Sequence, residues 1–339
     1  MVVANGGTGG MQAQVSLQAR LLAARGHEVH VAVGGGSGNG DAGVTSHDLP
    51  TFSPRSLSFI RQLATLVHRL QPDVVHAHGL RLAPALVLAG IGRTRVLECH
   101  GLDPRGEPAA AWRSLRAAVR AGVRVAACGS GPASLLASEL GDVYVINNLL
   151  PDSPVARDPR RDFPISADTR IAIWPARFSE QKGHSRLVDL ISILDDPRLA
   201  VICVGDGPLR HDVEADIARR GMSDRIICGD YSTMAGQWLA GSDLFIMPSW
   251  WEGQPTVGLE ALGAGLPIVS LTLLGDEDVV VEGTGMRAAD IHDAAEILRQ
   301  WLDDPRRQPH DENVRRGLLA RHGAEEVARD LSRVYGVEL

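Results

Sequence analysis

Short apolar runs alternate with longer segments of helical period along almost the whole chain. This alternation is typical of βαβ units, in which helices connect parallel strands. Between the first two apolar runs, residues 11–25 are expected to form a helix that ends at Gly26, because glycine commonly follows the last helical turn. The pattern predicts strands at residues 2–4, 29–33, 74–76, 95–99, 123–128, 143–146, 171–174, 199–204, 226–228, 244–247 and 267–271.

The periodic pattern is interrupted at residues 151–168, which contain four prolines and many charges. Such a stretch is typical of a boundary between domains, and 339 residues suffice for two hydrophobic cores. We therefore predict an α/β fold of two doubly wound, Rossmann-like domains at residues 1–150 and 169–318, with a linker at 151–168 and a final helical segment at 319–339. Open parallel sheets bind ligands at the carboxyl ends of their strands, so we expect the site in a cleft that both domains face.

The composition narrows the classes of partner. A net charge of −7 and an aromatic content of 4% do not suit nucleic acid binding, which requires a basic surface or stacking platforms. No run approaches the roughly 20 apolar residues of a membrane span. The N-terminus shows no secretory signal, although the first strand is so short that the natural start could lie upstream. We expect a cytoplasmic protein that binds small molecules, with Cys99, Cys128, Cys203 and Cys228 as buried thiols.

Glycines separate the first predicted strand from the first helix in NGGTGGMQ, residues 5–12. Glycines let the backbone approach a ligand closely, and a helix N-terminus attracts anions. The dinucleotide fingerprint G-x-G-x-x-G is not met, because Gln12 stands where the third glycine is required. Gly9 and Gly10 are therefore either ligand contacts or parts of a plain tight turn.

Two cations follow a predicted strand in WPARFSEQKG, residues 174–183. Arg177 and Lys182 can neutralise a diphosphate at the carboxyl end of that strand. Taken alone, they are equally well explained as solvated surface charges. Gly205, in VGDGPLR, ends the next strand and belongs to the same expected edge of the site.

Two glutamates flank a short loop in WEGQPTVGLEAL, residues 251–262. Glu252 is expected in the loop and Glu260 in the first turns of a helix, where each carboxylate can accept hydrogen bonds from sugar hydroxyls. Backbone N–H groups at the helix start, near Thr256 and Val257, are available for a phosphate. The pattern suits a nucleotide sugar, and the alternative is one capping and one exposed glutamate.

Metal-binding patterns are weak. His76 and His78 in VVHAHG suggest a metal site, but no further ligands are identifiable from the sequence. For these residues and for His100 in LECHG, a packed structural role is at least as consistent. The D-x-D pattern of Asp276 and Asp278 has no other metal feature nearby. We expect no metal.

The motifs resemble, in order, those of retaining glycosyltransferases with the GT-B fold, in the sucrose-synthase-like family 4, whose hallmark is an E-x7-E spacing. GGMQ, ARGHEVHV, DVVHAHG, ECHG, ARFSEQKG, VGDGPL and FIMPSWWEG extend the resemblance over nearly the whole chain. The resemblance implies that the first domain binds the acceptor and the second a UDP- or GDP-linked sugar. It also implies that the final helix returns to the first domain.

The resemblance further implies residue roles. Glu252 would bind donor-sugar hydroxyls, Glu260 the ribose, and His100 would lie beside the reacting sugar. Arg177 and Lys182 would hold the diphosphate and stabilise the leaving group. The remaining donor-binding positions are Gly9, Gly10, Gly205, Gly253, Thr256 and Val257. Transfer would need no cofactor, and it would retain configuration by front-face attack without the protein nucleophile of retaining glycosidases.

The chain departs from the family pattern near the donor. Gln254 and Pro255 stand where the family commonly has Phe-Gly, and proline supplies no N–H. Asp278 stands nearest to a usual glutamate. A non-catalytic nucleotide-sugar-binding protein is therefore an alternative, and a sugar-nucleotide epimerase of related two-domain form is another.

The acceptor is a small molecule or a glycan in the main interpretation. Glu98, Asp103 and Glu107 could favour a cationic acceptor such as an aminocyclitol, although solvated surface carboxylates explain them more simply. The basic and apolar faces of residues 55–70 could instead dock on an anionic membrane and imply a lipid acceptor. A core-packed helix explains that pattern more simply.

Overall fold

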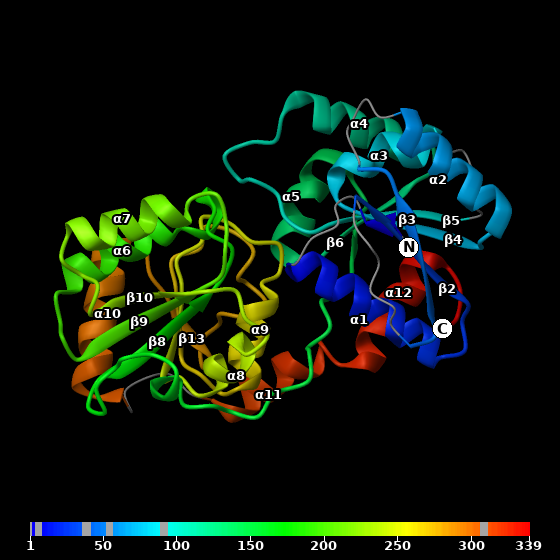
Figure 1. Cartoon of the computed structure of the whole chain (residues 1–339). Coiled ribbons are helices and arrows are strands. Elements are labelled where there is room, and N and C mark those ends of the chain that lie inside the picture. Colours follow the sequence, from blue (N-terminus) through cyan, green and yellow to red (C-terminus); the bar gives the residue numbers. More distant parts are fainter. Residues whose placement is uncertain (1, 4–8, 36–41, 52–56, 89–93, 306–310) are drawn as a thin grey trace. The chain divides into compact units, whose positions relative to one another are not determined.

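A computed structural model describes residues 2–3, 9–35, 42–51, 57–88, 94–305 and 311–339 of the 339-residue chain. The chain forms two compact units: unit 1 contains residues 1–149 and 321–339, and unit 2 contains residues 150–320 (Figure 1). Each unit is built on one parallel sheet with helices, as the alternation of apolar runs predicts.

The sheet of unit 1 has the strand order β3-β2-β1-β4-β5-β6-β7 in the described part of the chain, with parallel pairing throughout. The order reverses between β1 and β4, which makes the sheet doubly wound. Its strands are β1 (Val2–Val3), β2 (Val29–Gly34), β3 (Val44–Leu49), β4 (Val74–His78), β5 (Thr94–Cys99), β6 (Arg124–Ala127) and β7 (Tyr144–Val145).

Helices cover the sheet of unit 1, and apolar side chains alternate between its two faces. Val96 of β5 packs in a group with Leu331, whereas the next residue, Leu97, packs with Phe59 on the other face. The last helix of the chain lies beside the first (Figure 1). The helices are α1 (Gly10–Ala24), α2 (Leu57–Leu70), α3 (Ala83–Leu88), α4 (Ala109–Arg120), α5 (Ser130–Leu140) and α12 (Ala324–Tyr335), with the 3₁₀ helix η1 (Leu80–Leu82).

The sheet of unit 2 has the order β10-β9-β8-β11-β12-β13 and is also parallel among its described strands. Its order reverses between β8 and β11. The strands are β8 (Arg170–Pro175), β9 (Leu199–Val204), β10 (Ile226–Gly229), β11 (Leu244–Met247), β12 (Ile268–Ser270) and β13 (Gly285–Arg287). The helices are α6 (His184–Leu194), α7 (Arg210–Arg219), α8 (Ala235–Ala240), α9 (Thr256–Gly263), α10 (Ile291–Asp303) and α11 (Glu312–Ala320), with η2 (Pro159–Arg161) and η3 (Glu180–Lys182).

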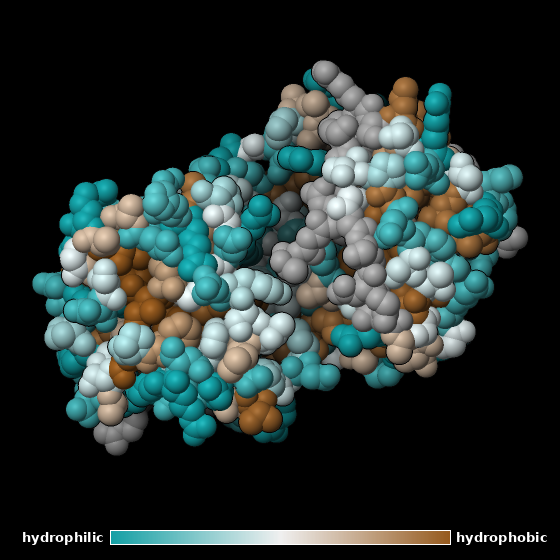
Figure 2. Space-filling view, in the orientation of Figure 1, coloured by the Kyte–Doolittle hydropathy of each residue, from teal (hydrophilic) through white to brown (hydrophobic). Residues whose placement is uncertain are grey.

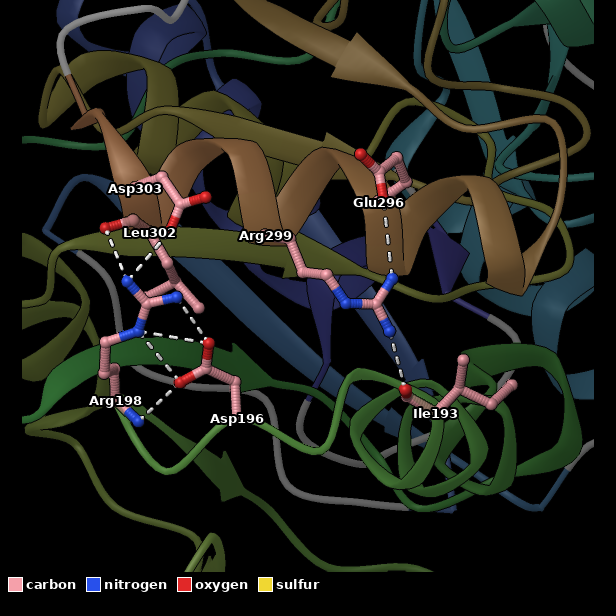
Figure 3. Close-up of polar contacts among 7 residues, drawn as sticks. All are labelled: Ile193, Asp196, Arg198, Glu296, Arg299, Leu302 and Asp303. Carbon is pink, nitrogen blue, oxygen red and sulfur yellow. Dashed lines mark hydrogen bonds and ion pairs between the residues drawn. The ribbon is translucent and has the colours of Figure 1, made fainter.

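Polar contacts join α10 to the last turn of α6 and to the segment that connects α6 with β9 (Figure 3). Arg198 donates hydrogen bonds to the Asp303 carboxylate at 2.9 Å and to the Leu302 carbonyl at 3.4 Å. Arg299 donates to the Ile193 carbonyl at 2.9 Å. Exposed ion pairs of this kind contribute little to stability. Most of the free energy that keeps α10 packed on unit 2 therefore comes from burial of its apolar face.

The helix predicted as a possible membrane-docking segment has its apolar face inside unit 1. Helix α2 directs Phe59, Leu63, Leu66 and Val67 into the core of unit 1, so the core-packed interpretation of this segment is confirmed. Among the described residues, none of the helices combines the length and apolarity that crossing a bilayer requires. Polar side chains cover much of the visible surface of each unit in Figure 2.

Candidate functional site

The segments that follow β8 and β11 meet at one edge of the sheet of unit 2. The strand order reverses between these two strands, and ligands of doubly wound sheets bind at such a position. After β8 the chain passes through Lys182, and after β11 it passes through Ser249 and Glu252 before α9 begins. The elements of unit 2 therefore place these three side chains where a ligand is expected.

Lys182 and Glu252 form a close ion pair at this edge. The Lys182 ammonium lies 2.6 and 2.7 Å from the two carboxylate oxygens of Glu252, and the Ser249 hydroxyl donates to Oε1 at 2.6 Å. Glu252 is only 4% exposed, so these partners compensate for its lost hydration. The ammonium retains one N–H and Glu252 Oε2 retains acceptor capacity, so both groups can also contact a ligand.

The identity of the cation is itself informative. The sequence contains 34 lysine and arginine residues, and Lys182 is the single lysine among them. Lysine presents a compact, strongly hydrated point charge, whereas arginine presents a planar fork that requires more room. The only ammonium side chain of the protein is thus paired with the buried carboxylate of the candidate site. This uniqueness is a signal that would have strengthened the interpretation of Lys182 from the sequence.

Two glycines permit the close approach of the loops around this pair. Gly183 has φ of 65°, and a Cβ there would lie 2.1 Å from the Pro248 carbonyl oxygen. Gly205, predicted to contact the donor, has φ of 152°, and a Cβ there would lie 2.3 Å from the Ala176 carbonyl oxygen. Both positions therefore require glycine for backbone packing alone, and the donor contact of Gly205 stays a prediction.

Sequence reasoning missed Arg186, which organises the loop before Glu252. Its Nη1 donates to the carbonyl oxygens of Pro248 and Ser249, both at 3.1 Å, and of Leu271 at 3.2 Å. Its guanidinium also lies 4.0 Å from the ring centroid of Trp250. A lone arginine in a helical segment resembles a solvated residue, so the sequence carries no signal for this role.

The other predicted phosphate contacts of unit 2 stay predictions. Arg177 is exposed after β8, and its side chain makes no hydrogen bond or ion pair with the rest of the described chain. Gly253 is buried in the loop after Glu252. Helix α9 begins at Thr256, followed by Val257, with Pro255 at the N-cap, and no side chain caps it.

Glu260 lies apart from this ion pair, in a pocket of about 220 Å³. Burial raises the pKa of Glu260 to about 7. Within the described residues its carboxylate has no hydrogen-bond partner, so a ligand with hydroxyl donors would satisfy it. The pocket is also lined by Pro151, Asp152, Ser153, Pro154, Ala156, Gly236, Leu239, Ala240 and Ala264, so the segment predicted as a linker contributes to it.

Two of the residues that depart from the family pattern, Gln254 and Asp278, contact each other. The Gln254 amide donates to the Asp278 carboxylate at 3.1 Å, and Gln254 is 4% exposed. Asp276 is buried and accepts from the Ser270 hydroxyl and from Arg287, both at 2.6 Å. The D-x-D carboxylates are therefore engaged by protein donors, which gives no support to the Mg²⁺ alternative for this segment.

The predicted residues of unit 1 lie at the carboxyl edge of its sheet. Gly9 is the N-cap of α1 and Gly10 its first residue, and both are exposed. Residues 5–8 of the glycine motif lie outside the described residues. His100 follows β5 and is 12% exposed at its side chain. Whether these residues contact a donor stays a prediction.

The interpretation of Glu98 as a solvated surface carboxylate is wrong. Glu98 is fully buried beside His76, His78 and His100, because its strand β5 pairs with β4 and places it directly opposite His78. Of the described residues, His76, His78 and Glu98 make up the one group with enough close donor atoms for a metal ion. Glu98 is thus the further candidate ligand that the sequence could not identify.

The rest of that acidic cluster is engaged locally. Asp103 pairs with Arg105 at 2.8 Å, and Glu107 accepts from the backbone N–H of Asp103 at 3.1 Å. These contacts lower the pKa of Asp103, chiefly through the Arg105 hydrogen bond. The three carboxylates therefore do not form one free acidic surface for a cationic acceptor.

Comparisons with known proteins match each part of the chain to a glycosyltransferase model. Residues 8–152 match the model described as Glycosyltransferase Family 4, and residues 169–304 match Glycosyl transferases group 1. Both parts of the chain thus match glycosyltransferase models, and the fold is of the GT-B type. The crystal structure of Anabaena HepE in complex with UDP and glucose has the same fold, with a TM-score of 0.81, 19% identity, and coverage of 99% of this chain and 98% of that one.

Curated glycosyltransferases are similar over shorter spans. The lipopolysaccharide core biosynthesis glycosyltransferase LpsD of Rhizobium meliloti is 29% identical over 49% of this chain and 50% of its own length. The 2-deoxystreptamine glucosyltransferase of Streptomyces kanamyceticus is 28% identical over 51% of this chain and 49% of its own length. The matched region thus spans about half the length of these relatives.

Proposed function

We propose that this GT-B glycosyltransferase transfers a hexosyl or N-acetylhexosaminyl group from a UDP- or GDP-linked donor to an acceptor hydroxyl, with retention of configuration. The observation that carries the proposal is the ion pair of the partly exposed Lys182 with the buried Glu252 at the reversal point of the second sheet. A nucleotide sugar presents a diphosphate for the cation and hydroxyls for the carboxylate.

The bonding of Glu252 favours a binding role over a nucleophilic one. Lys182 and Ser249 already donate to its carboxylate, which reduces its tendency to attack carbon but leaves it able to orient sugar hydroxyls. The departing diphosphate can then accept the acceptor's proton, while Lys182 and Arg177 stabilise its charge. No metal is needed in this scheme, since two cations are available.

UDP-linked sugars are the first donors to test, because the HepE structure contains UDP and glucose. In this proposal Glu260 binds the ribose, and the pocket that Glu260 lines holds the nucleoside. The acceptor is a glycan or small-molecule hydroxyl. The names of the relatives include a lipopolysaccharide core biosynthesis glycosyltransferase and a 2-deoxystreptamine glucosyltransferase, so glycan and small-molecule acceptors both belong in the assay.

A panel of UDP- and GDP-sugars, screened by thermal shift and then by donor turnover, tests the proposal. We expect one donor to raise the melting temperature and to be consumed, slowly alone and faster with an acceptor. The anomeric configuration of the product tests retention. Binding without turnover under every acceptor class would favour a non-catalytic binder, and donor isomerisation without transfer would favour an epimerase.

A further inference from the structure

A buried carboxylate with three histidines lies at the carboxyl edge of the sheet of unit 1, and the family resemblance gives a role to only one member of the group, His100. His76 and His78 alternate along β4 and therefore share one face of the sheet. Glu98 on β5 lies opposite His78, and His100 follows two residues later. His76, His78 and Glu98 are at most 1% exposed.

The distances between these groups are those of hydrogen bonds and ion pairs. Glu98 Oε2 lies 3.1 Å from His76 Nε2 and 3.5 Å from His78 Nδ1. His78 Nδ1 lies 2.8 Å from His100 Nε2. The other nitrogen of His76, Nδ1, lies 2.9 Å from the hydroxyl of Tyr335 in α12. The result is a connected chain of polar groups in an otherwise apolar core.

The ring geometry favours a hydrogen-bond network over a metal site. The rings of His76 and His78 are stacked, with centroids 4.2 Å apart and planes inclined by 28°. Because imidazole lone pairs lie in the ring plane, two nearly parallel rings do not direct them at one ion. The separation of 2.8 Å between His78 and His100 is that of an N–H···N hydrogen bond.

Charge is distributed unequally over the network. Burial raises the pKa of Glu98, but the charges of His100 and His76 and the hydrogen bonds from His76 and Gln18 outweigh it, so the net pKa is lowered. Burial lowers the pKa of both His78 and His100. These directions favour the ionised form of Glu98 and the neutral forms of His78 and His100, and a neutral imidazole carries one ring proton.

The position of the proton on His78 decides the position of the proton on His100. Glu98 lies near both rings, 3.5 Å from His78 Nδ1 and 3.6 Å from His100 Nε2, so the carboxylate by itself does not choose between them. The other nitrogen of His78, Nε2, has no hydrogen-bond partner within the described chain. A proton on Nε2 would leave a buried N–H without an acceptor, which is costly. A proton on Nδ1 instead donates to His100 Nε2, and His100 must then carry its own proton on Nδ1.

We propose that Glu98, acting through His78, fixes His100 as the Nδ1–H tautomer, so that His100 offers a hydrogen-bond donor to an oxygen of the bound donor sugar. Glu98 and His78 are positioning residues in this account, and within this network only His100 contacts substrate. The identity of the ligand rests on the proposed function, whereas the tautomer does not. His100 in this state cannot accept a proton at Nδ1 and is not a general base there.

The tautomer is measurable without any substrate. In ¹⁵N-histidine-labelled, full-length protein at neutral pH, two-bond ¹H–¹⁵N correlations distinguish a protonated Nδ1 from a protonated Nε2. The His100→Asn variant identifies the His100 signals by their loss. We expect a protonated Nδ1 and a bare Nε2, opposite to the usual preference of free histidine. A protonated Nε2, or protons on both nitrogens, would overturn the proposal, and the spectrum of the wild-type protein is sufficient to show it.

Variants test the route through Glu98 and His78. His78→Leu removes the donor, so His100 should shift toward the Nε2–H tautomer, and Glu98→Gln should shift it in the same direction. Tyr335→Phe removes the bond to His76 and should leave the His100 tautomer unchanged, which makes it the matched control. An unchanged His100 spectrum in folded His78→Leu protein would contradict the assigned route.

Activity measurements separate this inference from the proposed function. An asparagine amide can occupy the place of Nδ1–H, whereas a glutamine amide occupies that of Nε2, so His100→Asn should retain kcat/KM about tenfold better than His100→Gln. Equal losses in the two variants would contradict the donor role. If no nucleotide sugar is bound or consumed but the Nδ1–H tautomer is observed, the proposed function fails and the tautomer assignment stands.

Discussion

The Lys182 ammonium is the group on which the catalytic proposal depends most. Its ammonium is held by both oxygens of Glu252, and the backbone carbonyl of Lys182 accepts a hydrogen bond from the Trp174 indole at 3.1 Å. Lys182 is thus held both at its ammonium group and at its backbone carbonyl. A diphosphate that reaches this edge would meet a positioned charge, not a mobile one, and so would require less reorganisation in the transition state.

Replacing this ammonium should be costly even when charge is kept. We expect Lys182→Arg and Lys182→Ala each to lower kcat/KM about 100-fold or more, because the guanidinium does not fit the place of a compact ammonium between two carboxylate oxygens. Donor turnover checks this. Arg170→Lys, at a half-exposed residue, is the control and should leave turnover unchanged. Wild-type activity in Lys182→Arg would contradict the requirement for a point charge.

Glu260 should make stability depend on pH. Its pKa is raised from 4.5 to about 7, so its ionisation opposes folding, and this penalty is absent below pH 4.5 and complete above pH 7. Glu260→Gln removes this penalty. Its free energy of unfolding should therefore rise relative to that of the wild type between pH 5 and pH 8, by up to about 3 kcal/mol. Chemical denaturation measures it, with the exposed Glu282→Gln as control. An equal difference at both pH values would be inconsistent with a raised pKa.

At the scale of elements, the turn between η3 and α6 brings Lys182 to Glu252. Gly183 adopts a left-handed conformation there and touches the backbone after β11. Gly183→Ala should lower the free energy of unfolding by about 2–4 kcal/mol, because it adds a steric clash to backbone strain. Gly265 also has a positive φ, of 73°, but no atom lies within 4 Å of a Cβ added there. Gly265→Ala therefore introduces backbone strain without a clash, and it should lower the free energy of unfolding by less than Gly183→Ala does. Equal costs in thermal or chemical denaturation would show that the clash is relieved.

Most strands were predictable from the sequence because they are central and apolar on both faces. β3 and β13 were not predicted, and each lies at an edge of its sheet. β3 has one buried residue among six, and β13 has none, so neither shows a continuous apolar run. The other two edge strands, β7 and β10, were predicted from their apolar runs, so the weak apolar signal of β3 and β13, and not the edge position alone, explains why these two were missed.

The individual residues of the candidate site could be predicted from the sequence, but the contacts between them could not. Lys182 and Glu252 were each identified from their motifs, yet their contact depends on the order of β8 and β11. Glu98 was misinterpreted for the same reason, since its partners on β4 lie about 20 positions away and come together only through strand pairing. Arg186 binds backbone carbonyls that no local pattern reveals.

At the scale of the whole molecule, the chain ends in the unit in which it begins. Helix α12 buries Val327, Leu331, Val334 and Tyr335 in unit 1, and the Arg124 guanidinium donates to the Val334 carbonyl at 2.7 Å. The last segment of the chain therefore completes the core beneath the His100 network. Unit 1 cannot reach its final stability until residues 324–335 are available.

Disrupting this helix should loosen strands distant from it in sequence. Leu331→Asp places a charge in the core and should cost about 3 kcal/mol or more. Hydrogen exchange should show lost protection in β4, β5 and β6 of unit 1. Val337→Asp alters a residue that is 46% exposed and should leave protection unchanged. Full protection in Leu331→Asp would mean that α12 is dispensable for the sheet.

A chain with one lysine also has one side chain that amine-directed acylating reagents can label. Apart from the label on a terminal amine, a single mass increment would report whether Lys182 beside Glu252 is accessible. Mass spectrometry reads this increment without knowledge of the acceptor. Saturating nucleotide sugar should slow that labelling, and the same ligand without its pyrophosphate should not. The scarcity of lysine thereby turns an ordinary protein-chemistry reagent into a site-specific occupancy probe.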